Sequence, residues 1–336
     1  MTNKRSVAVG RVLENRRLCD EHYRLRLGLA AFAPARAGQF VQLQCRGPGE
    51  PADLLDRPWS PGDRPALAQP ELVGKEPLLR RPLSLAGFRR VGDGASGGAE
   101  LEVIYRTVGT GTNWLAAVGV GMELSVLGPL GNGFSVECGT GERSTGVPPV
   151  SRMGVSPMPR KAALISGGVG IGPMLFLART LRDAGVEVVA FCGARSARLL
   201  PLTIAGTGPS PVGEPLPCIE EFARLGVNTV VATDDASLGV GSTVTEAFRH
   251  YLDARLPGTG ELGVYSCGPE PMMRAAADLC LARGYTCHLA MERHMACGMG
   301  TCQSCVVKLR DDNDRGWSFK LCCTDGPVFD AREILW

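Results

Sequence analysis

The sequence has little lysine and no excess of charge of either sign. Only 5 of its 36 basic residues are lysine, which we interpret as a compositional bias and not as a guanidinium-rich binding surface. Lys+Arg 36 against Asp+Glu 34 leaves a formal net charge of +2. No overall basic field exists to hold nucleic acid or an anionic membrane. We therefore expect neither a nucleic-acid nor a membrane partner.

The chain also lacks a long uninterrupted apolar run and a visible secretory signal. Its longest uncharged stretch, residues 162–178, contains four glycines and Pro173, so we do not expect a transmembrane helix there. The N-terminal residues become charged again before an apolar h-region forms. We expect a cytoplasmic protein, and in that reducing compartment thirteen cysteines indicate metal ligation or buried thiols instead of disulfides.

The 336 residues suffice for about two to three domains. The first part of the chain alternates in the manner of antiparallel strands. From residue 161 the pattern changes to strands that alternate with helices, which predicts a parallel sheet with ligands at the carboxyl ends of its strands. The expected segments are an antiparallel β region at 1–138 with a loop insertion at 46–79, a low-complexity linker or insertion at 139–160, an α/β domain at 161–287, and a cysteine-rich subdomain at 288–336.

Three cysteines near the C-terminus are spaced C-x4-C-x2-C, and an adjacent pair follows them. They are Cys297, Cys302 and Cys305, then Cys322 and Cys323. This is the plant-type 2Fe-2S ligand spacing, and the glycines of ACGMGTCQSC let the loop curl so that backbone amides face the sulfides. A zinc site would show two C-x2-C pairs and a Rieske centre two paired histidines, so both are disfavoured, as are unligated buried cysteines. Spacing alone leaves the fourth ligand open, because adjacent residues of an extended segment point in opposite directions.

A glycine-rich loop, SGGVGIGPM, lies between a predicted strand and a predicted helix. Amides at such a helix N-terminus can bind a pyrophosphate, although Pro173 replaces the last glycine of the full motif and a tight packing turn is the alternative. Arg195 and Arg198 follow the second strand of this domain and would receive the 2′-phosphate if the nucleotide were NADP. The nucleotide-binding residues expected here are Gly167, Gly168, Gly170, Gly172 and, at the end of another predicted strand, Cys267.

Two more segments, RRPLSLAG at 80–87 and IYRTVGTGT at 104–112, complete a set of motifs. With GGVGIGP, CGP and the cysteine cluster, they resemble the ferredoxin reductase family, in which an antiparallel barrel binds flavin and an α/β domain binds nicotinamide nucleotide. In this resemblance Arg81 supplies a fixed charge for phosphate, Ser84 a short hydrogen-bonding group, and Gly111 a close approach of the pyrophosphate. The flavin contacts that it implies are Arg81, Pro82, Leu83, Ser84, Ile104, Tyr105, Arg106, Gly111 and Thr112.

The order of the motifs is similar to one subgroup of that family. A 2Fe-2S loop after the nicotinamide domain, with MERHMACGMGTCQSC followed by CTDGPVFD, resembles the electron-transfer subunit of the two-subunit, NAD-linked (B-type) dihydroorotate dehydrogenase. In that subunit the last ligand lies two residues before Asp-Gly-Pro-Val-Phe, which here selects Cys323. The resemblance implies a β plus α/β multidomain fold: a flavin-binding antiparallel β-barrel, a parallel-sheet NAD-binding domain, and a small C-terminal 2Fe-2S subdomain.

The same resemblance implies a function. Dihydroorotate would reduce FMN on a separate catalytic subunit, and electrons would pass through the 2Fe-2S cluster and FAD of this chain to NAD+ during de novo UMP synthesis. A flavin suits the middle position because it exchanges hydride with nicotinamide and single electrons with a cluster. The expected assembly is a heterotetramer of two subunits of each kind, and no catalytic residue for the organic substrate is expected in this chain.

Two alternatives remain open. The chain could be a flavin and iron-sulfur NAD(P)H reductase subunit that serves a hydrogenase, sulfite reductase or transhydrogenase complex. In a different class, it could be a metal-dependent interaction module whose glycine loops are only structural.

Overall fold

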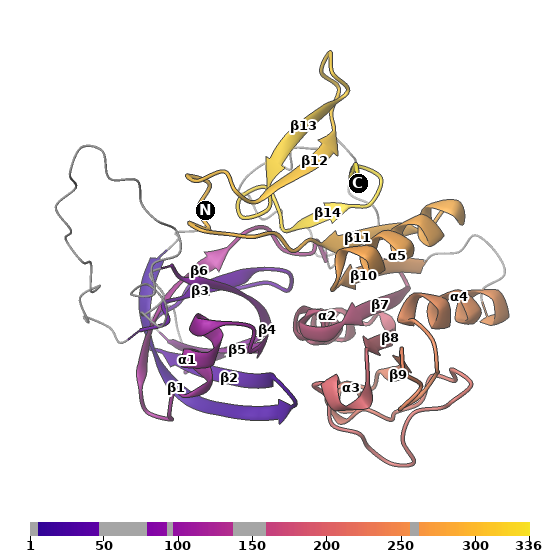
Figure 1. Cartoon of the computed structure of the whole chain (residues 1–336), viewed down its shortest axis with the longest axis horizontal. Helices are drawn as coiled ribbons and strands as arrows, with labels where there is room; N and C mark the ends of the chain where they lie inside the picture. Colours follow the sequence, from indigo (N-terminus) through magenta and orange to yellow (C-terminus); the bar gives the residue numbers. More distant parts are fainter. Residues whose placement is uncertain (1–5, 47–78, 93–96, 137–158, 256–261) are drawn as a thin grey trace, which may run out of the picture.

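The computed structural model describes residues 6–46, 79–92, 97–136, 159–255 and 262–336 (Figure 1). The two expected insertions, 46–79 and 139–160, lie almost wholly outside these residues. No helix of the described residues is long and apolar enough to cross a membrane.

The first half of the chain forms a closed barrel of six strands in the order β1-β2-β5-β4-β3-β6, all paired antiparallel. Alternating apolar residues, such as Leu25 and Leu27, point into the barrel core and leave arginines and glutamates outside. A helix, α1 (Thr110–Ala116), packs Leu115 into the same core. The strands are β1 (Ser6–Cys19), β2 (His22–Leu29), β3 (Phe40–Leu43), β4 (Arg81–Val91), β5 (Gly98–Arg106) and β6 (Glu123–Leu130).

The second half forms a six-stranded sheet in the order β14-β11-β10-β7-β8-β9. Five strands are parallel, as predicted, and the strand order reverses between β7 and β10. The sixth strand, β14, lies outside the predicted α/β segment and pairs antiparallel with the edge strand β11. The strands are β7 (Lys161–Gly167), β8 (Glu187–Ala194), β9 (Asn228–Thr233), β10 (Leu262–Cys267), β11 (Thr286–Ala290) and β14 (Val328–Asp330).

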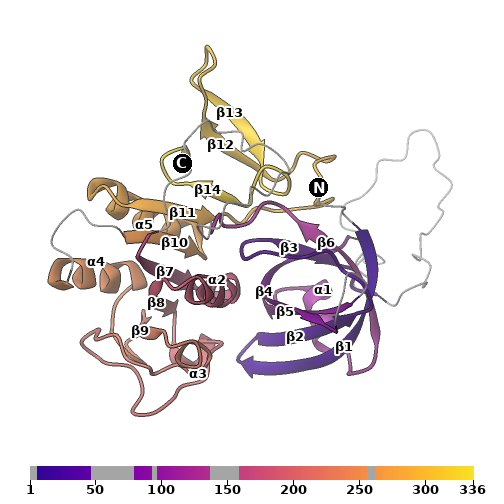
Figure 2. The ribbon, with the colours of Figure 1, turned by 180° about the vertical axis from the view of Figure 1, so that it is seen from behind.

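Helices cover both faces of this sheet. Helix α2 (Ile171–Asp183) lies between the sheet and β4 of the barrel, so that the two halves share one continuous core (Figures 1 and 2). Helices α4 (Val244–Arg255) and α5 (Glu270–Ala282) pack on strands of the sheet within a second apolar cluster. Helix α3 has only four residues, Glu220–Ala223. Backbone bonds of Leu216 to Thr229 and of Cys218 to Ala205 hold the segment before it extended.

The C-terminal part begins with an irregular loop after β11 and continues as a hairpin of β12 (Val306–Arg310) and β13 (Trp317–Leu321). The hairpin projects away from the barrel and sheet and corresponds to the hairpin-like stretch expected before Cys322 (Figure 1). Residues 131–132, which follow β6, connect the barrel to residues 325–328, the segment after this hairpin, through hydrogen bonds of Asn132. The side chain of Asn132 donates to the carbonyls of Asp325 (3.0 Å) and Val328 (2.8 Å) and accepts the N–H of Val328 (2.9 Å).

Candidate functional site

The cysteine loop is curled around the sulfur of Cys297. The backbone N–H groups of Met299 and Cys302 donate to its Sγ at 3.4 and 3.3 Å. Gly298 and Gly300 have φ of +68° and +94°, a region that glycine adopts without strain. These glycines therefore permit the curl that the sequence predicted, and amide donors of this kind stabilise a thiolate sulfur.

Cys302 is exposed, and its Sγ lies 3.2 Å from Ser304 Oγ. The hydrogen bond between these side chains lowers the pKa of Cys302 to about 6. At neutral pH this thiol is thus largely a thiolate, which is the form that binds iron.

The adjacent cysteines differ in what they contact. Cys322 is fully buried, and its thiol donates to the carbonyl of Met291 at 3.1 Å; burial raises its pKa well above the usual value. Cys323 instead donates its N–H to Cys305 Sγ at 3.4 Å, and its thiol interacts with the thiol of Cys305. Burial, followed by this neighbouring thiol, raises the pKa of Cys323 to about 12. Of the pair, Cys323 thus contacts the sulfur of Cys305, whereas the thiol of Cys322 is bonded to the Met291 carbonyl.

The four cysteine side chains stand as two pairs, Cys297 with Cys302 and Cys305 with Cys323. Among the described residues, no three histidine, cysteine or carboxylate side chains are gathered tightly enough to hold a single metal ion. Two thiol pairs nevertheless suit a two-iron cluster, in which each iron takes two protein ligands.

The residues expected to bind flavin phosphate come together where β4 begins. A Cβ atom on Gly111, in the first turn of α1, would lie 2.8 Å from Nε of Arg81. The backbone at Gly111 therefore lies against the guanidinium of Arg81. Pro82 and Ser84 lie opposite Gln42 and Phe40 of β3, and Leu83 opposite Val41.

Three other expected flavin residues have side chains engaged elsewhere. The hydroxyl of Tyr105 donates to Asn15 (2.9 Å) inside the barrel, and Arg106 pairs with Glu21. The hydroxyl of Thr112 accepts the N–H of Val108 and of Gly109 at the start of α1. The side chains of these three residues therefore already have partners within the protein.

The glycine loop ends β7 and leads through a single 3-10 turn, Gly168–Gly170, into α2. A Cβ atom on Gly170 would lie 2.1 Å from the carbonyl oxygen of Cys267, so this loop touches the end of β10. Gly167 and Gly170 thus lie beside Cys267 at the point where the strand order reverses, which is where open α/β sheets bind ligands. Gly172 faces the barrel, because its Cβ position lies 3.3 Å from Cβ of Ala86 on β4.

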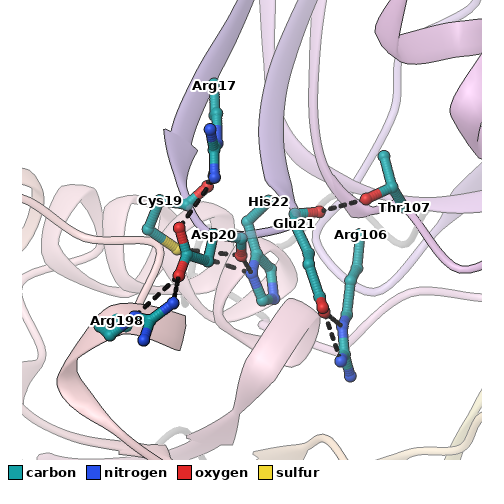
Figure 3. A network of polar contacts seen from close by, with 8 residues as sticks. All are labelled: Arg17, Cys19, Asp20, Glu21, His22, Arg106, Thr107 and Arg198. Atoms are coloured by element: carbon teal, nitrogen blue, oxygen red, sulfur yellow. Dashed lines mark hydrogen bonds and ion pairs between the residues drawn. The ribbon is translucent and has the colours of Figure 1, made fainter.

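The loop after β8 is held by the barrel (Figure 3). Nε and Nη2 of Arg198 donate to one carboxylate oxygen of Asp20 at 2.9 and 2.7 Å, and Asp20 N–H donates to the carbonyl of Arg198. These contacts hold the pKa of Asp20 below its usual value. Arg17 bonds the other carboxylate oxygen at 2.8 Å. Of the two guanidinium groups that the sequence offered for a 2′-phosphate, that of Arg198 is therefore paired with a carboxylate.

Sequence reasoning missed Asp20, Asn132 and Gln42, whose partners are far along the chain. Asp20 and Arg198 are 178 residues apart, and Asn132 and Val328 are 196 apart. A surface aspartate, a loop asparagine and a glutamine within a strand carry no local signal of such partners.

The barrel, the sheet with its glycine loop and the cysteine loop define the class of protein: a ferredoxin-reductase-like flavin and nicotinamide fold that carries an iron-sulfur binding region. Residues 292–335 match the family model "Iron-sulfur cluster binding domain of dihydroorotate dehydrogenase B". The chain is 35% identical over 261 residues to the dihydroorotate dehydrogenase B (NAD(+)) electron transfer subunit of Geobacillus kaustophilus, covering 77% of this chain and 81% of the relative. It therefore belongs to the family of dihydroorotate dehydrogenase B electron transfer subunits, and the expected family is confirmed.

Further comparisons extend this similarity over nearly the whole chain. The corresponding subunit of Caldanaerobacter subterraneus subsp. tengcongensis is 27% identical over 326 residues, with 97% of each chain covered. An NADH-dependent reduced ferredoxin-NADP oxidoreductase structure aligns with a TM-score of 0.64 at 20% identity, covering 98% of this chain and 90% of the other. The Amycolatopsis cytochrome P450 reductase GcoB aligns at 0.52 and 23% identity over 84% and 68%. These two structures support the fold, and the expected fold class is confirmed.

Proposed function

We propose that this chain carries electrons from the FMN of a catalytic dihydroorotate dehydrogenase subunit, through a 2Fe-2S cluster and FAD, to NAD+ in UMP synthesis. The observation that carries this proposal is the position of the barrel strands β3 and β4. The cysteine loop packs on β3 through Gly298 and Gln42, and the glycine loop packs on β4 through Gly172 and Ala86. Strands β3 and β4, of which β4 carries several of the proposed flavin contacts, thus touch both the cysteine loop and the glycine loop, and this contact supports the proposed path.

The residues present fit the groups that the family implies. Cys297 and Cys302 would hold one iron, and Cys305 and Cys323 the other, with backbone N–H groups directed at two of the sulfurs. Arg81 and the amides beside Gly111 would hold the FAD pyrophosphate. When bound, the flavin accepts single electrons and gives up a hydride, which is the conversion that a cluster and a nicotinamide cannot make directly.

The other role that we propose for this chain is to position the bound groups and to keep water from the space between their sites. Helix α2 brings the glycine loop against β4. Because Gly172 and Ala86 meet in a buried contact, they would exclude water between this loop and β4. Cys267 at the end of β10 is fully buried, and desolvation raises its pKa well above the usual value. A neutral thiol there adds no charge beside a bound nicotinamide.

NAD is favoured over NADP as the nucleotide. The carboxylate of Asp20 neutralises Arg198 and would repel a 2′-phosphate at the end of β8. From the loop after β9, Ser237 Oγ accepts the N–H of Ala197 (2.8 Å) on the loop after β8 and donates to the carboxylate of Asp235 (2.6 Å). The Ala197 N–H and the Ser237 hydroxyl, which would otherwise be free to donate to a phosphate, are thereby occupied.

The proposed division into domains is a barrel at 1–138, a nucleotide domain at 161–287 and a cluster subdomain at 288–336. The partner is an FMN-containing catalytic subunit, and we propose two subunits of each kind. An affinity purification of this chain from its own cells, followed by an anaerobic assay of dihydroorotate-dependent NAD+ reduction, tests the function.

The assay distinguishes the proposal from its alternatives. Activity that disappears when the co-purifying subunit is removed supports the proposed path. If dihydroorotate is inert while NADH bleaches flavin and cluster, the chain serves another electron partner. If the chain is colourless and NADH has no effect, it is an interaction module and the proposal fails.

A further inference from the structure

Gln42 is a buried side chain without a hydrogen-bond partner. It lies on β3, where Val41 and Leu43 point into the barrel core and Gln42 therefore points outward. Its side chain is nonetheless fully buried, at 0% exposure. Neither Nε2 nor Oε1 has a partner in the described part of the chain.

The cysteine loop covers this amide. A Cβ atom on residue 298 would lie 2.1 Å from Nε2 of Gln42, so only a glycine allows the loop to lie there. Gly298 has φ of +68° and directly follows Cys297. Gln42 also pairs in register with Pro82 of β4, the strand that carries several of the expected flavin contacts. The backbone carbonyl of Gln42 accepts a hydrogen bond from Nη1 of Arg80 at 3.3 Å.

A buried amide with no partner costs free energy, and native proteins rarely leave one unpaired. The Gln42 amide carries two N–H donors and lies against the residue that follows a cluster ligand. The acceptors on the adjoining loop are sulfurs: Cys297, next to Gly298 in the chain, accepts two backbone N–H groups at its Sγ, and Gln42 itself makes no hydrogen bond to a sulfur in this structure. A 2Fe-2S cluster would add further sulfur acceptors, and hydrogen bonds to its sulfurs are known to set its reduction potential.

We propose that Gln42 is a positioning residue whose side-chain N–H donates to a sulfur of the 2Fe-2S centre beside Cys297. This inference rests on the proposed function. Its consequence is that a residue of the flavin barrel, and not of the cluster subdomain, helps to set the cluster potential. Any shift of the cysteine loop relative to β3 then changes the driving force between the two centres.

The test compares Gln42→Met with Gln39→Met in the intact holoprotein. Gln39 is equally buried, but its Oε1 accepts the N–H of Arg36 (2.9 Å) and its Nε2 donates to the carbonyl of Gly131 (2.8 Å). Methionine keeps the length of glutamine and removes the donor. Redox titration with electron paramagnetic resonance of the reduced cluster is the readout.

Gln42→Met is expected to keep its iron and FAD content and to shift the flavin-cluster electron equilibrium about ten-fold toward the flavin, roughly 59 mV for a one-electron couple. Its resonance signal changes as well. Gln39→Met is expected to lower thermal stability and leave the potential and signal unchanged. An equilibrium in Gln42→Met within two-fold of wild type, with an unaltered signal, overturns the proposal.

A second measurement needs no variant. Wild-type protein labelled with 15N in glutamine side chains is expected to show a nitrogen coupling to the reduced cluster in pulsed resonance spectra. The absence of that coupling also overturns the role of Gln42. A wild-type chain that carries neither cluster nor flavin would instead refute the proposed function, so the two failures are distinguishable.

Discussion

Replacing the two adjacent cysteines, Cys322 and Cys323, with serine one at a time tests the geometry of the cysteine loop. Cys323→Ser is expected to lose the 2Fe-2S absorption, because serine replaces the thiolate that faces Cys305. Cys322→Ser is expected to keep it, because the Cys322 thiol is bonded to the Met291 carbonyl and not to the other cysteines. Each variant is the matched control for the other.

The cost of changing Cys322 follows from its burial. Replacing it with alanine removes one buried heavy atom, about 0.8 kcal/mol by analogy with a methylene, and leaves the Met291 carbonyl without this bond, about 1 kcal/mol more. The free energy of unfolding should therefore fall by about 2 kcal/mol in Cys322→Ala. Serine at this position can still donate to the carbonyl, so Cys322→Ser should lose about 1 kcal/mol.

Iron content, visible absorption and chemical unfolding of the purified variants check these expectations together. Cys322→Ala should retain its iron and unfold at lower denaturant concentration, whereas Cys323→Ser should be purified with little iron. Loss of absorption in Cys322→Ser with retention in Cys323→Ser would show that the assignment of the two side chains is reversed.

Four further predictions concern other parts of the molecule. Asp20→Asn releases Arg198 and should raise the ratio of the flavin bleaching rate with NADPH to that with NADH. We expect a rise of about two- to five-fold, because an exposed ion pair such as Asp20–Arg198 contributes only a small interaction free energy. An unchanged ratio contradicts the role given to Asp20. Gly170→Ala places a Cβ against the Cys267 carbonyl and should cost about 2–3 kcal/mol in unfolding free energy, whereas Gly109→Ala, with nothing within 4 Å of its Cβ position, should cost less than about 0.5 kcal/mol. Asn132→Ala removes three hydrogen bonds between the barrel and residues 325–328 and should cost about 2–3 kcal/mol, measured by thermal or denaturant unfolding. Burial lowers the pKa of His22 and of His288 below the usual 6.5. As pH falls below about 6.5, these histidines bind protons more readily in the unfolded chain than in the folded one, so the free energy of unfolding should decrease. A free energy of unfolding that does not change with pH in this range contradicts their burial.

The parts of the molecule that were predicted from sequence depend on local patterns. The spacing of Cys297, Cys302 and Cys305 lies within nine residues, and the glycine loop is one uninterrupted segment between a strand and a helix. Alternating apolar residues likewise indicated the barrel strands, because burial on one face leaves a period of two in the sequence. The family and the fold class followed from these motifs and are confirmed.

The parts that could not be predicted depend on pairs of residues that meet only after folding. The pairing of β14 with β11 was missed, since the short segment Val328–Asp330 has no strand pattern of its own. The start of helix α3 likewise depends on backbone bonds from β9 and from the segment around Thr203, which keep residues 216–219 extended. Gln42 reads as an ordinary strand residue until the cysteine loop is placed over it.

The pairing of β14 with β11 has a consequence for how the cysteine loop folds. The cysteine loop and its hairpin leave the sheet at the end of β11 and return to the neighbouring strand, so both ends of this excursion are anchored side by side. Because β14 follows Cys323 in the chain, this pairing closes the segment that carries Cys297, Cys302, Cys305 and Cys323. Part of the entropic cost of bringing Cys323 to Cys305 is therefore met by the folding of the sheet itself.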